Sequence, residues 1–311
     1  MKNKILLLIV ILLFGGVIFI PQKKELEENK EIKEEVKEDN KAIFVNLLNE
    51  ETNTITKENL EEYVVGVVSA EMPSVFNMEA LKAQAVAART YALYKKQTRN
   101  LSYDLIIGTK DQAYKNNETL LNLWQTNFFA NYLKIREAVE STKGEVLTYQ
   151  GEVINAFYFS MSNGYTEKSE LVFSQSLPYL NSVSSSWDNE VLPNFTYTVT
   201  LSKQDFCQKL DITCDVISVD AIKRSDTHRV LEITINNKSF KGTVFRSLLN
   251  LRSTDLELAL KEDEIQITTK GYGHGVGMSQ YGANGMASEG YTYEDILKYY
   301  YQKTEIKNIY A

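Results

Sequence analysis

Glu71 is the residue best placed for acid chemistry. A helix is predicted over residues 60–71, because apolar side chains recur there at helical spacing, at Leu60, Val64, Val67 and Val68. Glu71 continues the same face, and Pro73 stops the helix soon afterwards. Apolar surroundings and the negative end of the helix macrodipole both raise the pKa of such a carboxyl. A carboxyl that stays protonated near neutral pH can protonate a glycosidic oxygen; the alternative is a glutamate that turns back to solvent.

A second predicted helix supplies two cations. Asn77 is a suitable N-cap, and residues 78–96 follow with an alanine-rich interior that lets another helix approach closely. Lys82 and Arg89 are seven residues apart and therefore share one face. That face could point hydrogen-bond donors at a polar ligand beside the first helix. The alternative is an ordinary solvated face.

Two later segments carry polar side chains near tight turns. The sequence Ser160-Met161-Ser162-Asn163-Gly164 resembles a nucleophile elbow, but it lacks the first glycine and a strand-to-helix context with a nearby histidine. Its hydroxyls, Asn163 and the following Thr166 are better interpreted as hydrogen-bond partners of a sugar.

The second of these segments, residues 271–285, contains six glycines but no phosphate-binding or dinucleotide-binding motif. Its glycines allow close approach of backbone to a ligand. His274, Ser279 and Gln280 could contact sugar hydroxyls, and Tyr272 and Tyr281 could stack on sugar rings. A core turn shaped by glycine is an equal alternative for each of these residues.

A second carboxylate would distinguish hydrolysis of a glycan from an intramolecular, lytic cleavage. A hydrolase needs a base or nucleophile opposite its acid. Glu167 and Glu170 are the weak candidates, and a surface or turn-stabilising role suits Glu167 better.

The N-terminus predicts a membrane anchor. Lys2 and Lys4 precede an apolar run over residues 5–20, and no small-x-small cleavage site follows it. Positive charge before the run predicts a single-pass protein with a cytoplasmic N-terminus and everything after residue 21 outside. Residues 22–41 read as a charged tether, and residues 42–311 as the ectodomain.

The ectodomain is acidic, which argues against nucleic acid as a partner. The two lysines of the first segment offset the tether's net −2, so residues 42–311 carry the chain's full charge of −7. Cys207 and Cys214 could form a disulfide or remain reduced. They and the two histidines, His228 and His274, lack metal-ligand spacing, so we expect neither a metal site nor a cofactor.

The predicted fold is α+β. A helical lobe holds Glu71, and a β-rich lobe faces it across a substrate groove. Residues 145–149 and 153–160 read as strands joined at Gly151, and residues 293–301 as a closing amphipathic helix.

Several motifs together resemble the stage II sporulation protein D family. They are Ala70-Glu71-Met72-Pro73, Asp111-Gln112-Ala113-Tyr114, Pro178-Tyr179-Leu180 and residues 79–92, 160–167 and 271–283. The resemblance implies a lytic transglycosylase that cuts denuded peptidoglycan strands during engulfment, with Glu71 as catalytic acid and Lys82 and Arg89 at functional positions. Some members hold zinc with a histidine and cysteines in the segment that here spans residues 94–114; this chain has none of these ligands there.

The resemblance also implies partners and a second possible role. The partners would be the amidase stage II sporulation protein P and stage II sporulation protein M, in the engulfing mother-cell membrane. The same domain occurs in amidase enhancers, so a glycan-binding protein that activates an amidase is the alternative function.

Overall fold

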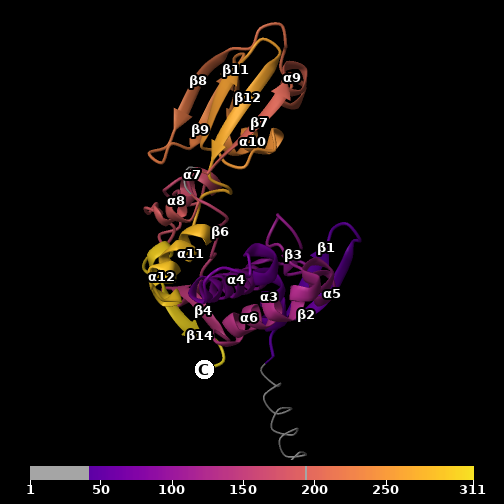
Figure 1. Cartoon of the computed structure of the whole chain (residues 1–311), viewed down its shortest axis with the longest axis vertical. Helices are drawn as coiled ribbons and strands as arrows, with labels where there is room; N and C mark the ends of the chain where they lie inside the picture. Colours follow the sequence, from indigo (N-terminus) through magenta and orange to yellow (C-terminus); the bar gives the residue numbers. More distant parts are fainter. Residues whose placement is uncertain (1–41, 193–194) are drawn as a thin grey trace, which may run out of the picture. The chain divides into compact units, whose positions relative to one another are not determined.

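The computed structural model describes residues 42–192 and 195–311. The predicted anchor and the whole of the predicted tether, residues 22–41, lie outside the described residues. Within the part that is described, no helix combines the length and apolar character needed to cross a membrane. Residues 44–311 form one compact unit of mixed α+β structure, in which several small sheets accompany the helices (Figure 1).

The two predicted helices are confirmed. Helix α3 (Leu60–Glu71) ends at Glu71, and Asn59 caps its N-terminus by accepting from the N–H groups of Glu61 and Glu62. Helix α4 (Met78–Thr98) begins directly after Asn77, whose side chain accepts from a backbone N–H in the first turn. The carboxyl of Glu71 therefore stands at the end of a helix whose inner face is buried.

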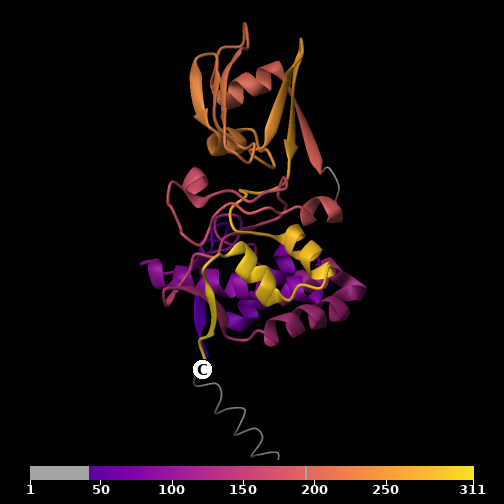
Figure 2. The same ribbon diagram turned by 90° about the vertical axis from the view of Figure 1, so that its left-hand side faces the viewer.

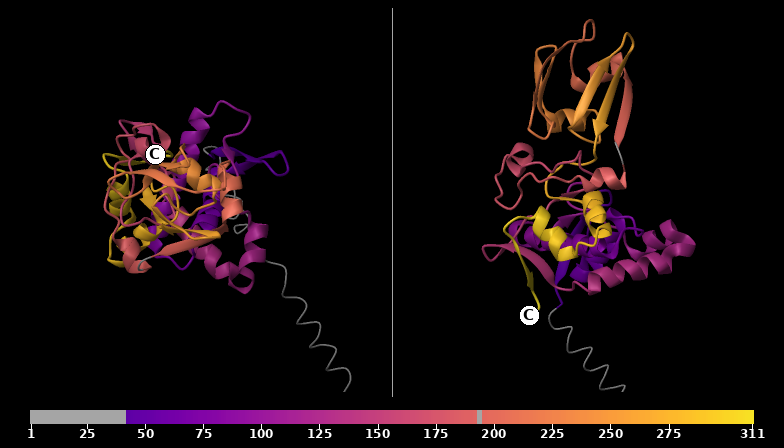
Figure 3. Two further views of the ribbon diagram at one scale, coloured as in Figure 1. Left: turned by 90° about the horizontal axis from the view of Figure 1, so that it is seen from above. Right: turned by 60° about the vertical axis from the view of Figure 1, so that its left-hand side comes forward.

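Helix α4 is the centre of the helical region. Its alanines are fully buried, because α3, α6 (Phe128–Glu140), α11 (Gln280–Ser288), α12 (Tyr293–Tyr300) and strand β4 (Glu145–Tyr149) all pack against it. Small side chains permit this close approach. Figures 1 and 3 show α11 and α12, from the C-terminal end of the chain, lying beside α4.

The remaining elements of the helical region flank this core. Strands β1 (Phe44–Asn49) and β2 (Thr54–Asn59) form a hairpin to which β3 (Leu105–Ile106) adds in parallel. Helix α5 (Asn117–Trp124) and the 3-10 turn η2 (Gln125–Asn127) lead into α6. The short helices α7 (Ser169–Phe173) and α8 (Trp187–Val191) lie in the connection to the β-rich region.

The predicted hairpin at Gly151 is confirmed, but its second strand is shorter than expected. Strands β4 and β5 (Glu152–Val153) are joined by Gln150 and Gly151, both with positive φ, as a two-residue hairpin turn requires. Strand β14 (Glu305–Asn308) pairs with the other edge of β4. The chain then leaves this sheet, and β6 (Tyr158–Phe159) pairs in parallel with β13 (Met278–Ser279), so residues 153–160 form two strands with different partners.

A separate β-rich region spans residues 196–270 (Figure 2). One sheet has the order β11-β12-β7 and the other β10-β9-β8; the strands are β7 (Thr196–Ser202), β8 (Val219–Arg224), β9 (Val230–Ile235), β10 (Lys238–Lys241), β11 (Leu256–Leu260) and β12 (Glu264–Lys270). Both sheets and the helices α9 (Lys203–Leu210) and α10 (Gly242–Leu248) enclose one apolar core. Cys207 and Cys214 form a disulfide, which settles the alternative that the sequence left open.

Arg89 is a structural residue, so the prediction that it points at a ligand is wrong. Its side chain is fully buried, and its Nε and Nη2 atoms donate to the Glu61 carboxylate at 3.0 and 2.6 Å. It also donates to the backbone carbonyls of Val139 and Glu145. One guanidinium thus links α3, α4, α6 and β4. The prediction failed because helical spacing identifies the face on which Arg89 lies but not the element that covers that face.

Lys82 lies in different surroundings from Arg89. Its ammonium pairs with Glu79 at 2.8 Å and sits over the ring of Tyr293 in α12. Glu79 in turn accepts from the Tyr293 backbone N–H. Lys82 therefore faces the C-terminal helix rather than Glu71.

We predict that Arg89→Ala lowers the free energy of unfolding by about 3–5 kcal/mol, because Glu61 keeps a buried charge without its partner. Lys82→Ala is the matched control on the same helix, and its partly exposed pair should contribute less than about 1 kcal/mol. Urea unfolding of both variants measures this. An Arg89→Ala protein that keeps its stability but loses function would restore the ligand-binding role predicted from the sequence.

Candidate active site

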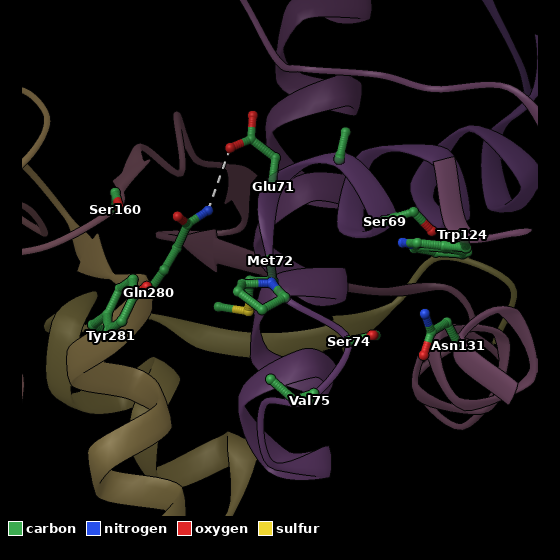
Figure 4. A pocket seen from close by; sticks show the side chains of 12 residues that line it. Ser69, Glu71, Met72, Ser74, Val75, Trp124, Asn131, Ser160, Gln280 and Tyr281 are labelled. Atoms are coloured by element: carbon green, nitrogen blue, oxygen red, sulfur yellow. Dashed lines mark hydrogen bonds between the residues drawn. The ribbon is translucent and has the colours of Figure 1, made fainter. Parts of the chain in front are cut away.

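Glu71 lines a pocket of about 530 Å³, a volume suited to a small ligand or part of a polymer. Figure 4 shows Gln280, Tyr281 and Ser160 on one side of Glu71, and Ser69, Trp124 and Asn131 on the other. The lining is hydroxyl, amide, aromatic and aliphatic. It consists of Ser69, Ala70, Glu71, Met72, Pro73, Ser74, Val75, Trp124, Asn131, Ser160, Gln280 and Tyr281.

The pocket matches the predicted groove only in part. Its described lining residues come from α3 and the loop after it, from α5, α6 and α11, and from Ser160; none belongs to the β-rich residues 196–270. The end of the glycine-rich segment does reach the pocket, through Gln280 and Tyr281. The glycine-rich segment therefore faces Glu71 as predicted, whereas the strands of residues 196–270 contribute nothing to the described lining.

A backbone N–H and a side-chain amide both donate to the Glu71 carboxyl. The backbone N–H of Ala113 donates to Oε1 at 2.8 Å, and the Gln280 side-chain amide donates to Oε2 at 3.4 Å. Ala113 reaches Glu71 because the following segment crosses α3 at Gly66, where a Cβ atom would collide with the Tyr114 ring and the Lys115 carbonyl. Glycine at position 66 is thus needed to bring the Ala113 donor alongside the carboxyl.

The pKa of Glu71 is raised above its usual value near 4.5. Burial is the largest cause, because desolvation disfavours the charged form. The hydrogen bonds from Ala113, Gln280 and Tyr158 and the charge of Lys115 act in the opposite direction without cancelling the shift. Glu71 therefore holds its proton at a higher pH than an exposed glutamate does, as a general acid requires.

A buried polar chain leads from Glu71 into the core. Gln280 is 4% exposed, and its amide also lies 3.5 Å from the Oε1 atom of Gln84 in α4. A second chain runs from the Tyr63 hydroxyl to Gln112, at 2.9 Å, and from Gln112 to the Tyr158 hydroxyl, at 2.8 Å. Burial raises the pKa of both tyrosines, so they remain neutral donors around the carboxyl.

Several of the predicted sugar-binding residues are internal structural groups instead. Ser162 and Ser279 donate to the buried Asp188 carboxylate at 2.8 and 2.6 Å, and Ser279 also caps α11. Asn163 donates to the Thr227 carbonyl and to Asp255, and Thr166 bridges the backbone at Asn181 and Val183. All four are at most 6% exposed, so the structure contradicts a ligand-binding role for them.

Tyr272 and His274 also lie away from the pocket lining. Tyr272 is 46% exposed and lies beside Arg252, whose guanidinium is 5.3 Å from the ring centroid. His274 is surrounded by Phe157, Phe159 and Phe173, and burial lowers its pKa to about 3, so it is neutral at physiological pH.

Glu167 and Glu170 do not face Glu71 either. They line a different pocket, together with residues of the β-rich region. Glu167 is 2% exposed and accepts hydrogen bonds from Ser225 and Thr227, so its stabilising role is confirmed but a surface position is not.

The sequence reasoning missed the wall opposite Gln280. Trp124, Asn131 and Ser69 line it, and none belongs to a recognisable motif. A weak signal for Trp124 is that it follows the apolar residues 120, 121 and 123, which are more apolar side chains than one buried face of a short helix can cover. Among the described residues, no group of three or more His, Cys, Asp or Glu side chains could hold a metal ion.

Comparison with known proteins identifies similar chains. Residues 48–149 match the family model described as Stage II sporulation protein. The chain is 45% identical over 255 residues to Stage II sporulation protein D of Bacillus subtilis. It is 44% identical over 256 residues to Stage II sporulation protein D of Bacillus amyloliquefaciens. Each match covers 79% of this chain and 74% of the relative. It is also 31% identical over 300 residues to the amidase enhancer of Bacillus subtilis, covering 78% of this chain and 40% of that protein.

We predict that Glu71→Gln makes the protein more stable at neutral pH. A raised pKa means that the folded state disfavours the ionised carboxyl. Ionised Glu71 therefore lowers the free energy of unfolding at pH values above its folded pKa, and this loss of stability disappears as the pH falls below the unfolded pKa near 4.5. Glutamine removes that cost. Urea unfolding across pH 4–8 should show that the variant has a higher free energy of unfolding than the parent, and that this difference becomes smaller as the pH falls.

The matched control is Glu118→Gln, an exposed glutamate in α5. It should change stability by no more than about 0.5 kcal/mol at any pH. A Glu71→Gln protein that is less stable than the parent at neutral pH would show that the ionised carboxyl is favoured by the fold.

Proposed function

The chain belongs to the stage II sporulation protein D family, and from that premise we propose that it is a lytic transglycosylase that cuts peptidoglycan glycan strands, with Glu71 as both acid and base. One observation carries this proposal. Glu71 is a carboxyl with a raised pKa, and among the described residues that line its pocket it is the one acidic side chain.

The first step is protonation of the glycosidic oxygen that links muramic acid to the next sugar. Glu71 gives up its proton as that bond breaks, and positive charge builds at the anomeric carbon of the muramic acid. The donors at Ala113 and Gln280 then stabilise the carboxylate that has formed, since both already point at its oxygens.

The second step needs a nucleophile, and the site favours one from the substrate. A hydrolase would place a second carboxyl roughly 5–10 Å from the acid to activate water or to attack directly. The lining described here offers none, so we assign the attack to the C6 hydroxyl of the same muramic acid. Glu71 accepts its proton, no water is consumed, and the product is a 1,6-anhydro-muramic end. An intramolecular nucleophile also avoids the entropy cost of bringing in a separate one.

The pocket's neutral lining favours a peptide-free strand as the substrate. Hydroxyl, amide and aromatic groups suit sugar rings, and no lysine or arginine occurs among the described lining residues to pair with the charged groups of stem peptides. We therefore propose denuded strands, which an amidase such as stage II sporulation protein P would supply. We place the ectodomain outside the membrane, with residues 1–21 as its anchor, beside stage II sporulation protein M.

A second function is favoured by the similarity to an amidase enhancer. In that role the pocket would bind a glycan strand and the protein would stimulate a partner amidase, with Glu71 serving only to bind.

We predict that Glu71→Gln lowers the cleavage rate by at least about 10²–10⁴-fold, the usual contribution of one general acid or base, while strand binding persists. Peptide-stripped strands are digested with each protein and analysed by mass spectrometry. The parent should yield ends lighter than reducing ends by one water.

Glu170→Gln is the control, since this exposed residue lines the other pocket and should leave cleavage unchanged. Reducing ends as the sole product would make the protein a hydrolase. Absence of cleavage, combined with stimulation of an added amidase by parent and Glu71→Gln alike, would support the enhancer role.

A further inference from the structure

Trp124 stands at the edge of the pocket, on the side away from Gln280 (Figure 4). It is the last residue of α5, and the next residue, Gln125, has a φ of 47°, which ends the helix and turns the chain toward α6. The indole is partly exposed. A large aromatic ring at a chain turn beside a polar pocket can offer a flat surface to a ligand.

The Phe128 ring contacts the indole, and a second aromatic ring supports Phe128. Its ring centroid lies 6.3 Å from that of Phe128, and Phe128 stacks on Tyr132 at 5.3 Å, one turn further along α6. These contacts restrict the position of the indole before a ligand binds. A ring that is already ordered loses little conformational freedom on binding, so the entropic cost of binding is low.

The wall that carries Trp124 is also fixed relative to Glu71. Lys134 of α6 donates to the Phe76 carbonyl, in the loop after the catalytic helix, at 2.7 Å. Arg136 of α6 pairs with Glu62 of α3 at 2.5 Å. Two contacts from one helix therefore hold the wall at a set distance from the carboxyl, as a subsite next to a reacting bond requires.

Polar groups beside Trp124 lack partners within the described structure. The half-buried Asn131 lines the pocket one turn after Phe128, and its amide has no hydrogen bond to the other described residues. Ser69 also lines the pocket, is 6% exposed, and its hydroxyl has no partner. Buried polar groups are normally satisfied, so the Ser69 hydroxyl is a hydrogen-bonding group at this wall that the described chain itself leaves unused.

We propose that Trp124 and Asn131 form a sugar-binding subsite for the residue next to the one cleaved at Glu71, with the indole stacked on a pyranose ring and the amide bonded to its hydroxyl or N-acetyl groups. The inference rests on the proposed glycan substrate. It assigns a second, separate contact to the strand, one that acts through binding and not through proton transfer.

Fluorescence can test the stacking directly, because the chain has two tryptophans. The other, Trp187, packs edge-on against Tyr291 and Tyr299 and does not line the pocket. In a Glu71→Gln background, Trp187→Phe leaves Trp124 as the single reporter, and Trp124→Phe leaves Trp187. Peptide-stripped strand fragments should shift the emission of the first protein saturably and leave that of the second unchanged.

Affinity measured by calorimetry in the same background gives an independent readout. Trp124→Ala should weaken binding of the fragments by about 5- to 30-fold, and Trp124→Phe by less, since it keeps a ring. Leu123→Ala is the matched control: this residue is on the same helix, 55% exposed and outside the pocket lining, and its substitution should leave affinity unchanged. Equal thermal midpoints would show that all variants are folded.

The outcomes separate this proposal from the proposed function. If the parent cleaves strands but Trp124 emission does not respond and Trp124→Ala binds normally, the subsite is overturned while the function stands. If Leu123→Ala weakens binding as much as Trp124→Ala, the contact belongs to the exposed apolar surface of α5 and the subsite is again overturned. If the fragments neither bind nor are cut, the glycan function and the subsite both fail.

Discussion

The close packing of α3 against α4 sets the geometry of the whole site. The buried alanines of α4 allow α3, α6 and α11 to approach one helix from several sides. The Arg89–Glu61 pair then fixes α3 and α4 to α6 and β4, because each polar atom of that buried pair needs a specific partner. Because α3 is held in this way, the position of its last residue, Glu71, in the pocket lining is fixed.

The chemistry follows from a competition around that last residue. Burial favours the neutral carboxyl, and the donors from Ala113, Gln280 and Tyr158 favour the charged one. Burial prevails, so Glu71 holds its proton to a higher pH than an exposed glutamate does, while the donors already point at the oxygens that carry the charge of the ionised form. The described lining holds no second acidic side chain, and this is the feature on which the proposed attack from within the substrate rests.

Local patterns predicted the parts of this arrangement that depend on sequence neighbours. The end of α3 at Glu71 and the start of α4 after Asn77 follow from helix periodicity, Pro73 and capping. Spacing does not tell which element covers a helical face, so it predicts a ligand contact for Arg89, whose side chain is buried against Glu61. Among the later motifs, Gln280 and Tyr281 reach the pocket while Ser279 turns inward to Asp188, a difference set by how α11 packs. The sequence carries only a weak signal for Trp124 and none for Asn131, because their position depends on the turn between α5 and α6.

The source of the oxygen in the product tests the central claim most directly. Peptide-stripped strands are cut in water labelled with heavy oxygen, and the new muramic ends are weighed. If Glu71 directs the C6 hydroxyl onto the anomeric carbon, the ends carry no label and remain one water lighter than reducing ends, and Glu71→Gln yields none of them. Ends that carry one labelled oxygen would show that water is the nucleophile and would contradict the account.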